Sequence, residues 1–134
     1  MRTYRLALSA TGEYSQKLGG SKAQVVEEMM TVVNRINQIL LSDLAVQFEL
    51  VDNQDVIFTD GTSDPFSNND AASDVESNQN TLDNVLGSAN YDIGHLLSTN
   101  GGGLAAVASI CSNGSKGTAT TGSNIPQGER FYID

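Results

Sequence analysis

Basic residues and cysteine are scarce in this sequence, and each shortage excludes something. Seven lysines and arginines stand against sixteen aspartates and glutamates, which leaves a net charge of −9. Such a surface repels a phosphate backbone, so we expect no nucleic acid among the partners. The single cysteine, Cys111, has no partner for a disulfide within the chain. It is therefore either a small apolar residue of the core or one half of a bridge whose partner lies elsewhere.

Histidine and long apolar runs are equally scarce. His95 is the only imidazole in the 134 residues, and a zinc site needs several convergent ligands, so we expect no zinc site within them. No apolar run approaches the length of about 18 residues that a membrane-spanning helix requires. The chain also starts without the apolar segment of a signal peptide. It contains no Ser-His-Asp set, Walker motif, C-x-x-C or H-E-x-x-H.

The N-terminal part has the clearest structural pattern, within a length that fits one domain. Residues 2–10 alternate between the two faces of a strand. Ser21 and Gln24 form a capping box, and apolar residues follow at spacings of three and four, which predicts a helix over residues 22–42. A second alternating stretch at residues 44–53 completes a strand-helix-strand unit with parallel strands, typical of an α/β fold.

The second half predicts a weaker helix and two more strands. Residues 76–91 return to helical spacing after a long polar loop. Residues 91–97 alternate, and residues 104–110 are small and apolar, so each segment predicts a strand. The tail is rich in turn residues until the apolar run at residues 131–133, where the sequence stops. Because domains seldom stop on a fresh apolar run, we expect the domain to continue beyond it; a short closing strand is the alternative.

His95 lies in the strand predicted at residues 91–97, where Tyr91, Ile93, His95 and Leu97 share one face. An apolar face predicts a hydrogen-bonded histidine of the core, not a catalytic base. Asp92 is adjacent in sequence, but adjacent strand residues point to opposite faces, so Asp92 is not positioned to orient the imidazole.

The three glycines between the last two predicted strands allow two interpretations. Residues 101–106, GGGLAA, satisfy the dinucleotide-binding pattern G-x-G-x-x-A, with a nucleotide as the ligand. The following segment is too short and small for a helix, and no second strand-helix-strand unit follows. We therefore favour a bend or bulge that turns the chain into an edge strand.

The polar loop carries oxygen ligands of the type that calcium prefers. Their spacing fits no EF-hand loop, and aspartate and asparagine are also common in turns for their own local hydrogen bonds. We favour turn chemistry over a structural cation, and assign no calcium ligand. The candidates are Asp52, Asp55, Asp60, Asp64, Asn68, Asn69 and Asp70.

Four segments taken in order resemble the bacterial branch of the reprolysin-like zinc metalloproteases, within the metzincin clan. They are VNRINQIL in the long helix, DPFSNN in the loop, SANYDIGHLLSTNGGGLA and the terminal GERFYID. The resemblance covers nearly the whole chain. It implies a zincin-like N-terminal subdomain, with a twisted, mostly parallel sheet of four to five strands, an antiparallel edge strand and two main helices.

In that family, the segment that resembles FYID runs directly into the H-E-x-x-H helix. The resemblance therefore implies that residues 1–134 are a truncated part of a catalytic domain and carry no catalytic or zinc-binding residue. His95 matches a position that is not a zinc ligand, and Cys111 matches one that pairs with a cysteine of the missing half. The parent would be a secreted hydrolase that uses zinc and, in some members, calcium.

The resemblance also gives the glycine segment a function. An edge strand at this position aligns an extended peptide or protein substrate through its backbone. The residues that match it are Gly102, Gly103, Leu104, Ala105, Ala106 and Val107. The leading hypothesis is thus part of a zinc-dependent endopeptidase, inactive by itself. The alternatives are a non-catalytic peptide-binding or adhesion module that uses the same edge, and a nucleotide-binding protein. An uncovered edge would also allow self-association.

Overall fold

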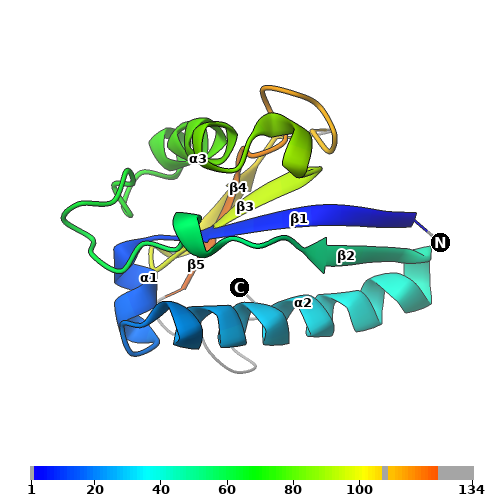
Figure 1. Ribbon diagram of the computed structural model, residues 1–134, viewed down its shortest axis with the longest axis horizontal. Coiled ribbons are helices and arrows are strands. Elements are labelled where there is room, and N and C mark those ends of the chain that lie inside the picture. The colour runs from blue at the N-terminus through cyan, green and yellow to red at the C-terminus, as the bar shows by residue number, and fades with distance from the viewer. Residues whose placement is uncertain (1, 107–108, 124–134) are drawn as a thin grey trace.

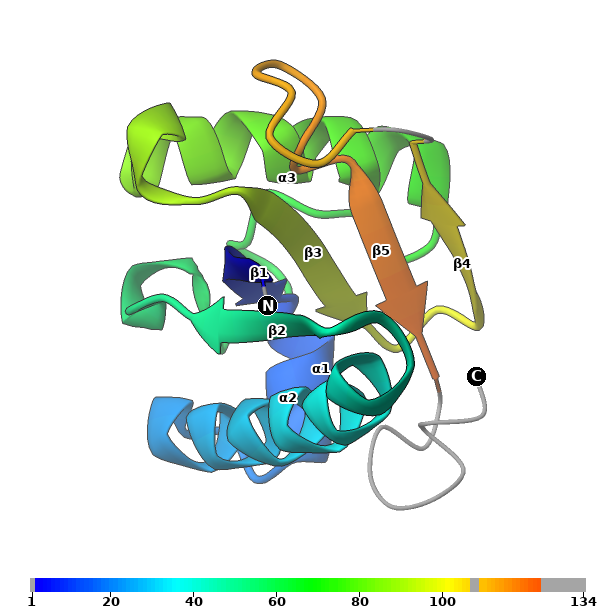
Figure 2. The same cartoon turned by 90° about the vertical axis from the view of Figure 1, so that its right-hand side faces the viewer.

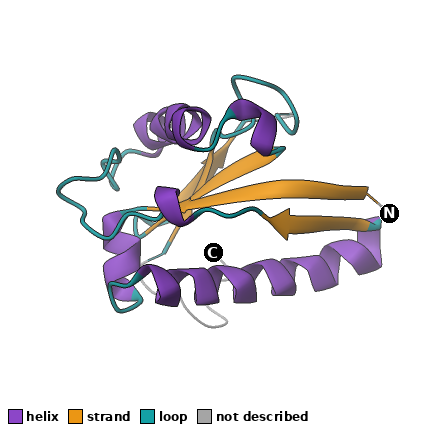
Figure 3. Ribbon diagram, viewed as in Figure 1, coloured by secondary structure: helices purple, strands orange, loops and turns teal. Residues whose placement is uncertain are grey.

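The computed structural model describes residues 2–106 and 109–123, which form a sheet between two helices (Figure 1). The five strands lie in the order β2-β1-β3-β5-β4. Helix α2 covers one face of the sheet and α3 covers the other (Figure 3). The elements are β1 (Arg2–Ala10), α1 (Gly12–Lys17), α2 (Lys22–Leu44), β2 (Val46–Leu50), η1 (Gln54–Val56), α3 (Ala71–Val85), η2 (Ser88–Asn90), β3 (Ile93–Ser98), β4 (Gly102–Ala105) and β5 (Ala119–Gly122).

The predicted fold class is confirmed. The pairs β1–β2, β1–β3 and β3–β5 are parallel, and β4 pairs antiparallel with β5. The predicted unit β1-α2-β2 is present. Helix α2 begins where the capping box predicts, because the Ser21 side chain accepts from the backbone N–H of Gln24 at 3.2 Å. None of the described helices is long and apolar enough to cross a membrane.

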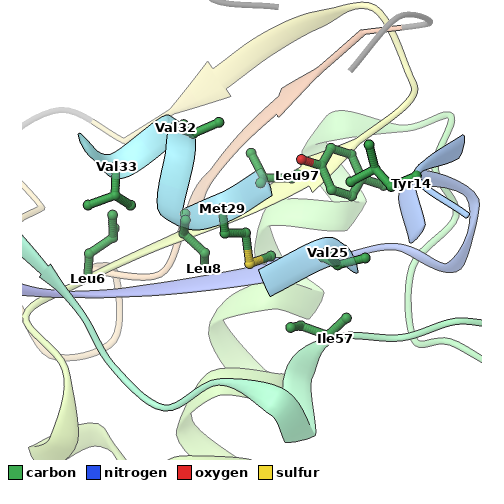
Figure 4. Packing of buried hydrophobic residues seen from close by; sticks show 11 residues of the cluster. Leu6, Leu8, Tyr14, Val25, Met29, Val32, Val33, Ile57 and Leu97 are labelled. Atoms are coloured by element: carbon green, nitrogen blue, oxygen red, sulfur yellow. The ribbon is translucent and has the colours of Figure 1, made fainter. Parts of the chain in front are cut away.

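The larger core lies between α2 and the sheet. Leu6 and Leu8 of β1 face Val25, Met29 and the following turns of α2, which gives the alternation of residues 2–10 its structural reason (Figure 4). Tyr14 of α1 closes one end of this core; α1 itself is a short helix where the sequence indicated only a polar connection. A buried Met→Ala change costs about 2–5 kcal/mol, so loss of the Met29 side chain should destabilise the fold by about that much.

The α3 side differs from prediction at two places. Helix α3 begins at Ala71, several residues before the expected start, because the Asp70 carboxylate caps it by accepting from the N–H of Ser73. Tyr91 lies before β3 and packs with Leu82 on the α3 side. It therefore does not share the face of His95, and that prediction was wrong.

The last strands are also placed differently. The strand expected at residues 104–110 is β4, which begins earlier at Gly102 and ends at Ala105; by Cys111 the chain turns with a positive φ of 62°. Strand β5 falls in a stretch expected to be turns. Its four residues are too few to show a period, and they become a strand because β3 and β4 bond them from both sides.

Candidate substrate-binding edge

Strand β4 is an edge of the sheet, as the sequence predicted for this segment (Figure 2). Among the described residues it pairs with β5 alone, with Gly103 opposite Thr121 and Leu104 opposite Thr120. All four residues of β4 are exposed, and Ala106 follows the strand. Val107, which the sequence also placed on the edge, lies outside the described residues.

The ladder fixes which backbone groups face outward. The N–H of Ala106 donates to the carbonyl of Thr118 at 3.0 Å. Residues of an antiparallel pair alternate between bonding to the partner strand and facing away from it. Leu104 and Gly102 therefore bond to β5, while the N–H and C=O groups of Gly103 and Ala105 face away from the sheet. These four groups form the candidate site.

The side chains of β4 are too small to cover the edge on the α2 face of the sheet, but not on the α3 face. Gly103 and Ala105 present almost no side chain on the α2 side of the sheet. Leu104 shares the opposite face with the buried Thr120, and 44% of its surface remains exposed beside α3. No charged residue or proline occupies β4, although those are the residues that commonly block an edge strand.

Of Gly101 and Gly102, only Gly102 has a backbone conformation that favours glycine. Gly102 has a φ of 95°, which a side chain would strain. A Cβ at Gly101 or Gly102 would meet no described atom within 4 Å, so packing against the rest of the described chain does not require glycine there. The dinucleotide interpretation of residues 101–106 was wrong, because the segment enters a strand and provides no helix N-terminus for a pyrophosphate.

The other edge of the sheet, β2, is closed. Ala45 and Val51 bond to β1, so alternate residues, including Phe48, face outward. The side-chain amide of Asn37 on α2 meets Phe48 there: the Phe48 N–H donates to Oδ1 and Nδ2 donates to the Phe48 carbonyl, both at 2.8 Å. At Phe48, an asparagine thus takes the place of a sixth strand. The sequence offered only the amphipathic position of Asn37, which did not reveal this contact.

His95 lies on β3, on the α2 side of the sheet, and is half-buried. Its Nε2 is 2.8 Å from the Thr121 hydroxyl on β5, and burial lowers the pKa of the imidazole to about 4. It is therefore neutral at neutral pH. The hydrogen bond confirms the sequence prediction for this histidine. Asp92 is turned away from it and binds the Arg5 guanidinium at 2.9 Å; that bond holds the pKa of Asp92 below its usual value.

The loop carboxylates bind their own chain. Asp60 accepts from the N–H and hydroxyl of Thr62, and Asp64 accepts from the N–H of Gly12 at 2.6 Å. Asp52, Asp55 and Asn69 are exposed. Within residues 2–106 and 109–123, no three histidine, cysteine or acidic side chains gather as a metal site requires. The described residues therefore do not fit a zinc centre. Asp60 and Asp64 make the local hydrogen bonds that turn chemistry favours, and the absence of a calcium site stays a prediction.

Cys111 is exposed, with a free thiol. Its backbone N–H donates to the carbonyl of Asp92 at 2.8 Å, which fixes the turn after β4 against the start of β3. The core alternative for this cysteine was wrong. A bridge to a cysteine outside the chain stays a prediction.

The comparisons with known proteins agree with this arrangement. Residues 1–133 match the family model described as Metallo-peptidase family M12B Reprolysin-like. A search of the curated proteins finds no match. A metallopeptidase family acts on peptides or proteins, and an exposed, unblocked edge strand suits an extended polypeptide. The match spans nearly every residue of the sequence, and it confirms the resemblance seen in the four segments. The chain belongs to the reprolysin-like M12B metallopeptidases.

Proposed function

We propose that β4 aligns the polypeptide substrate of a zinc-dependent endopeptidase by strand addition. One observation carries the proposal: the N–H and C=O groups of Gly103 and Ala105 face away from the sheet at an exposed edge of a metallopeptidase-family chain. Added strands gain affinity from main-chain hydrogen bonds, whatever their sequence. Such an edge suits an enzyme that cleaves peptide bonds within different amino-acid sequences.

The test uses the peptide acetyl-Thr-Val-Leu-Val-Thr-amide and two versions of it, N-methylated on alternate amides. Titration is followed through the backbone amide NMR signals of Gly103 and Ala105. Because alternate amides of an added strand face the edge, only one methylated version should lose binding. Equal binding by both versions, or signals that move at β2 and not at β4, would contradict the proposal.

We further propose that the zinc ligands belong to residues outside 1–134. The single histidine of the chain is half-buried and bonded to Thr121, and the described residues contain no cluster that fits the metal. We expect this chain, incubated with zinc and casein, to release no peptides. Zinc-dependent cleavage by this chain alone would show that the zinc ligands lie within residues 1–134, against the proposal.

The same edge would serve a non-catalytic peptide-binding or adhesion module, and the single histidine is the observation that favours this alternative. The two are distinguished by the gene beyond codon 134. An H-E-x-x-H helix shortly after Asp134 supports the peptidase, and a different domain supports the module.

Export of the parent protein is part of the proposal. Cys111 is exposed, and a disulfide to another part of the parent would persist only in an oxidising compartment. Alkylation of the protein recovered from culture medium tests this. Protection of the Cys111 thiol until a reductant is added supports the bridge, and immediate alkylation contradicts it.

A further inference from the structure

Asn68 joins three parts of the molecule through one side chain. It lies in the loop before α3, with a left-handed φ of 61°. Its Oδ1 accepts from the hydroxyl of Thr11 at 2.9 Å and from the N–H of Thr99 at 3.1 Å. Its Nδ2 donates to the hydroxyl of Thr99 at 2.7 Å. The amide therefore connects the end of β1 to the residue that follows β3.

The first turn of α3 holds Asn68 in this position. Asp74 is only 3% exposed, and its Oδ2 accepts from the N–H of Asn68 at 2.9 Å. Its Oδ1 accepts from the N–H and the hydroxyl of Ser67 at 2.7 and 2.9 Å. The carboxylate thus takes three bonds from the loop, so the Asn68 amide is presented to Thr99 from a fixed backbone.

Thr99 opens the turn that leads into the substrate-binding edge. The turn, residues 99–101, joins β3 to β4. On one side it rests on β5, where a Cβ at Gly122 would lie only 1.7 Å from the carbonyl oxygen of Asn100. On the other side Asn68 binds Thr99. Beyond these two contacts, a Cβ added at Gly101 or Gly102 would have no described atom within 4 Å.

Resting on the proposed strand addition, we propose that Asn68 is a positioning residue for the substrate: its amide fixes Thr99, and so the direction in which the chain enters β4. An edge strand binds tightly only if its outward groups are already aligned, because any ordering on binding reduces the affinity. Asn68 supplies that alignment from the loop. The sequence suggested this asparagine only as a cation ligand, but its oxygen is occupied by Thr11 and Thr99.

The test compares Asn68→Gly with Asn69→Ala. Glycine adopts the left-handed conformation without strain, so Asn68→Gly removes the amide alone. Asn69 is exposed and hydrogen-bonded only through its backbone N–H, which makes it the matched control. With acetyl-Thr-Val-Leu-Val-Thr-amide as the probe, we expect about tenfold weaker binding for Asn68→Gly and faster hydrogen exchange at Thr99. Asn69→Ala should match the wild type.

Two further variants separate positioning from general stability. Asn68→Asp keeps an acceptor for the Thr99 N–H and should recover part of the affinity. Asn37→Ala weakens the opposite edge and should lower the unfolding midpoint without changing the affinity for the probe. If Asn68→Gly does not fold, Thr99→Val, which removes only the hydroxyl, supplies the comparison and should bind about threefold more weakly.

The outcomes are distinct. A wild-type protein that does not bind the probe at Gly103 and Ala105 removes the proposed function, and the positioning role with it. A wild type that binds, together with an Asn68→Gly variant that binds equally well, overturns the positioning role alone. Equal losses of affinity in Asn68→Gly and Asn37→Ala would also overturn it, since they would reflect general destabilisation.

Discussion

The two edge strands of this sheet, β2 and β4, differ in whether their outward backbone groups have hydrogen-bond partners in the described chain. At β2, the outward N–H and C=O of Phe48 are bonded by the Asn37 amide. At β4, the corresponding groups of Gly103 and Ala105 meet no described partner, and the side chains around them are small or absent. Proteins ordinarily protect edge strands because open ones pair with other chains. This difference between the two edges is what the proposed strand addition at β4 rests on.

The β4 side of the sheet carries the residue through which acid should destabilise the fold, and this is the largest effect that we expect. His95 binds Thr121 on the β4 side of the sheet, and burial lowers the pKa of His95 to about 4, below its ordinary 6.5. The unfolded chain therefore binds the proton more readily, so stability is lost as the pH falls below about 6.5. Between pH 7 and pH 5 this amounts to about 2 kcal/mol. Urea unfolding across this range measures it.

The His95→Asn variant is the control for the acid effect, because it keeps a polar partner for Thr121 without a titrating group. Its unfolding free energy should change less than that of the wild type from pH 7 to pH 5. Parallel curves for the two proteins would assign the acid sensitivity to carboxylates instead.

Opening the closed edge should be the next largest effect. Asn37→Ala leaves the half-buried Phe48 backbone groups without their partner, at a cost of about 1–2 kcal/mol. Urea unfolding at neutral pH measures the loss. The neighbour Gln38 provides the control, since Gln38→Ala should stay within about 0.5 kcal/mol of the wild type. If both variants unfold alike, Asn37 does not protect β2.

Closing the open edge should abolish its pairing at little cost to the fold. Ala105→Pro removes one outward N–H and leaves the bonds to β5 in place, because the Ala105 N–H faces away from β5. We expect at least tenfold weaker peptide binding, about 1.4 kcal/mol, measured by NMR titration. Leu104→Pro removes an N–H that faces β5 and should instead destabilise the fold. The opposite ranking of the two prolines would show that the outward groups have been misassigned.

Self-association through β4 should be the smallest effect. Two copies can pair through Gly103 and Ala105, and the net charge of −9 on each copy opposes this. Added salt screens that repulsion, so sedimentation should show association rising severalfold between low and high ionic strength. Ala105→Pro should stay monomeric throughout. Association of that variant would point to another surface.

Sequence patterns predicted the N-terminal half better than the rest, for a physical reason. Two local patterns lie in this half: the alternation of residues 2–10, and the capped apolar periodicity of residues 22–42. The apolar faces that these patterns predict pack against each other in the folded chain. Strand β5 has no such signal in its four residues, and α1 has only the Thr11 cap at its start. Both depend on partners distant in sequence: β3 and β4 for the first, and the core around Tyr14 for the second.

The candidate site divides in the same way. Glycines 101–103 and the small residues after them favour an edge strand over a dinucleotide-binding loop, because the segment that follows is too short and small for a helix. The composition does not reveal which backbone groups face outward, since that depends on the register of β4 against β5. Nor does it reveal the amide of Asn68, whose partners Thr11 and Thr99 are far along the chain.

By itself, the sequence determined the α/β class, the strand-helix-strand unit at its start and the family to which the four segments point. Tertiary structure alone decided that β4 is open in the part of the chain that the structure describes, that Asn37 bonds the outward groups of Phe48 on β2, and that Asn68 bonds Thr99 in the turn into β4. The reason is physical. Periodicity and composition act between residues close along the chain, whereas an edge is open or closed according to what the folded chain brings beside it.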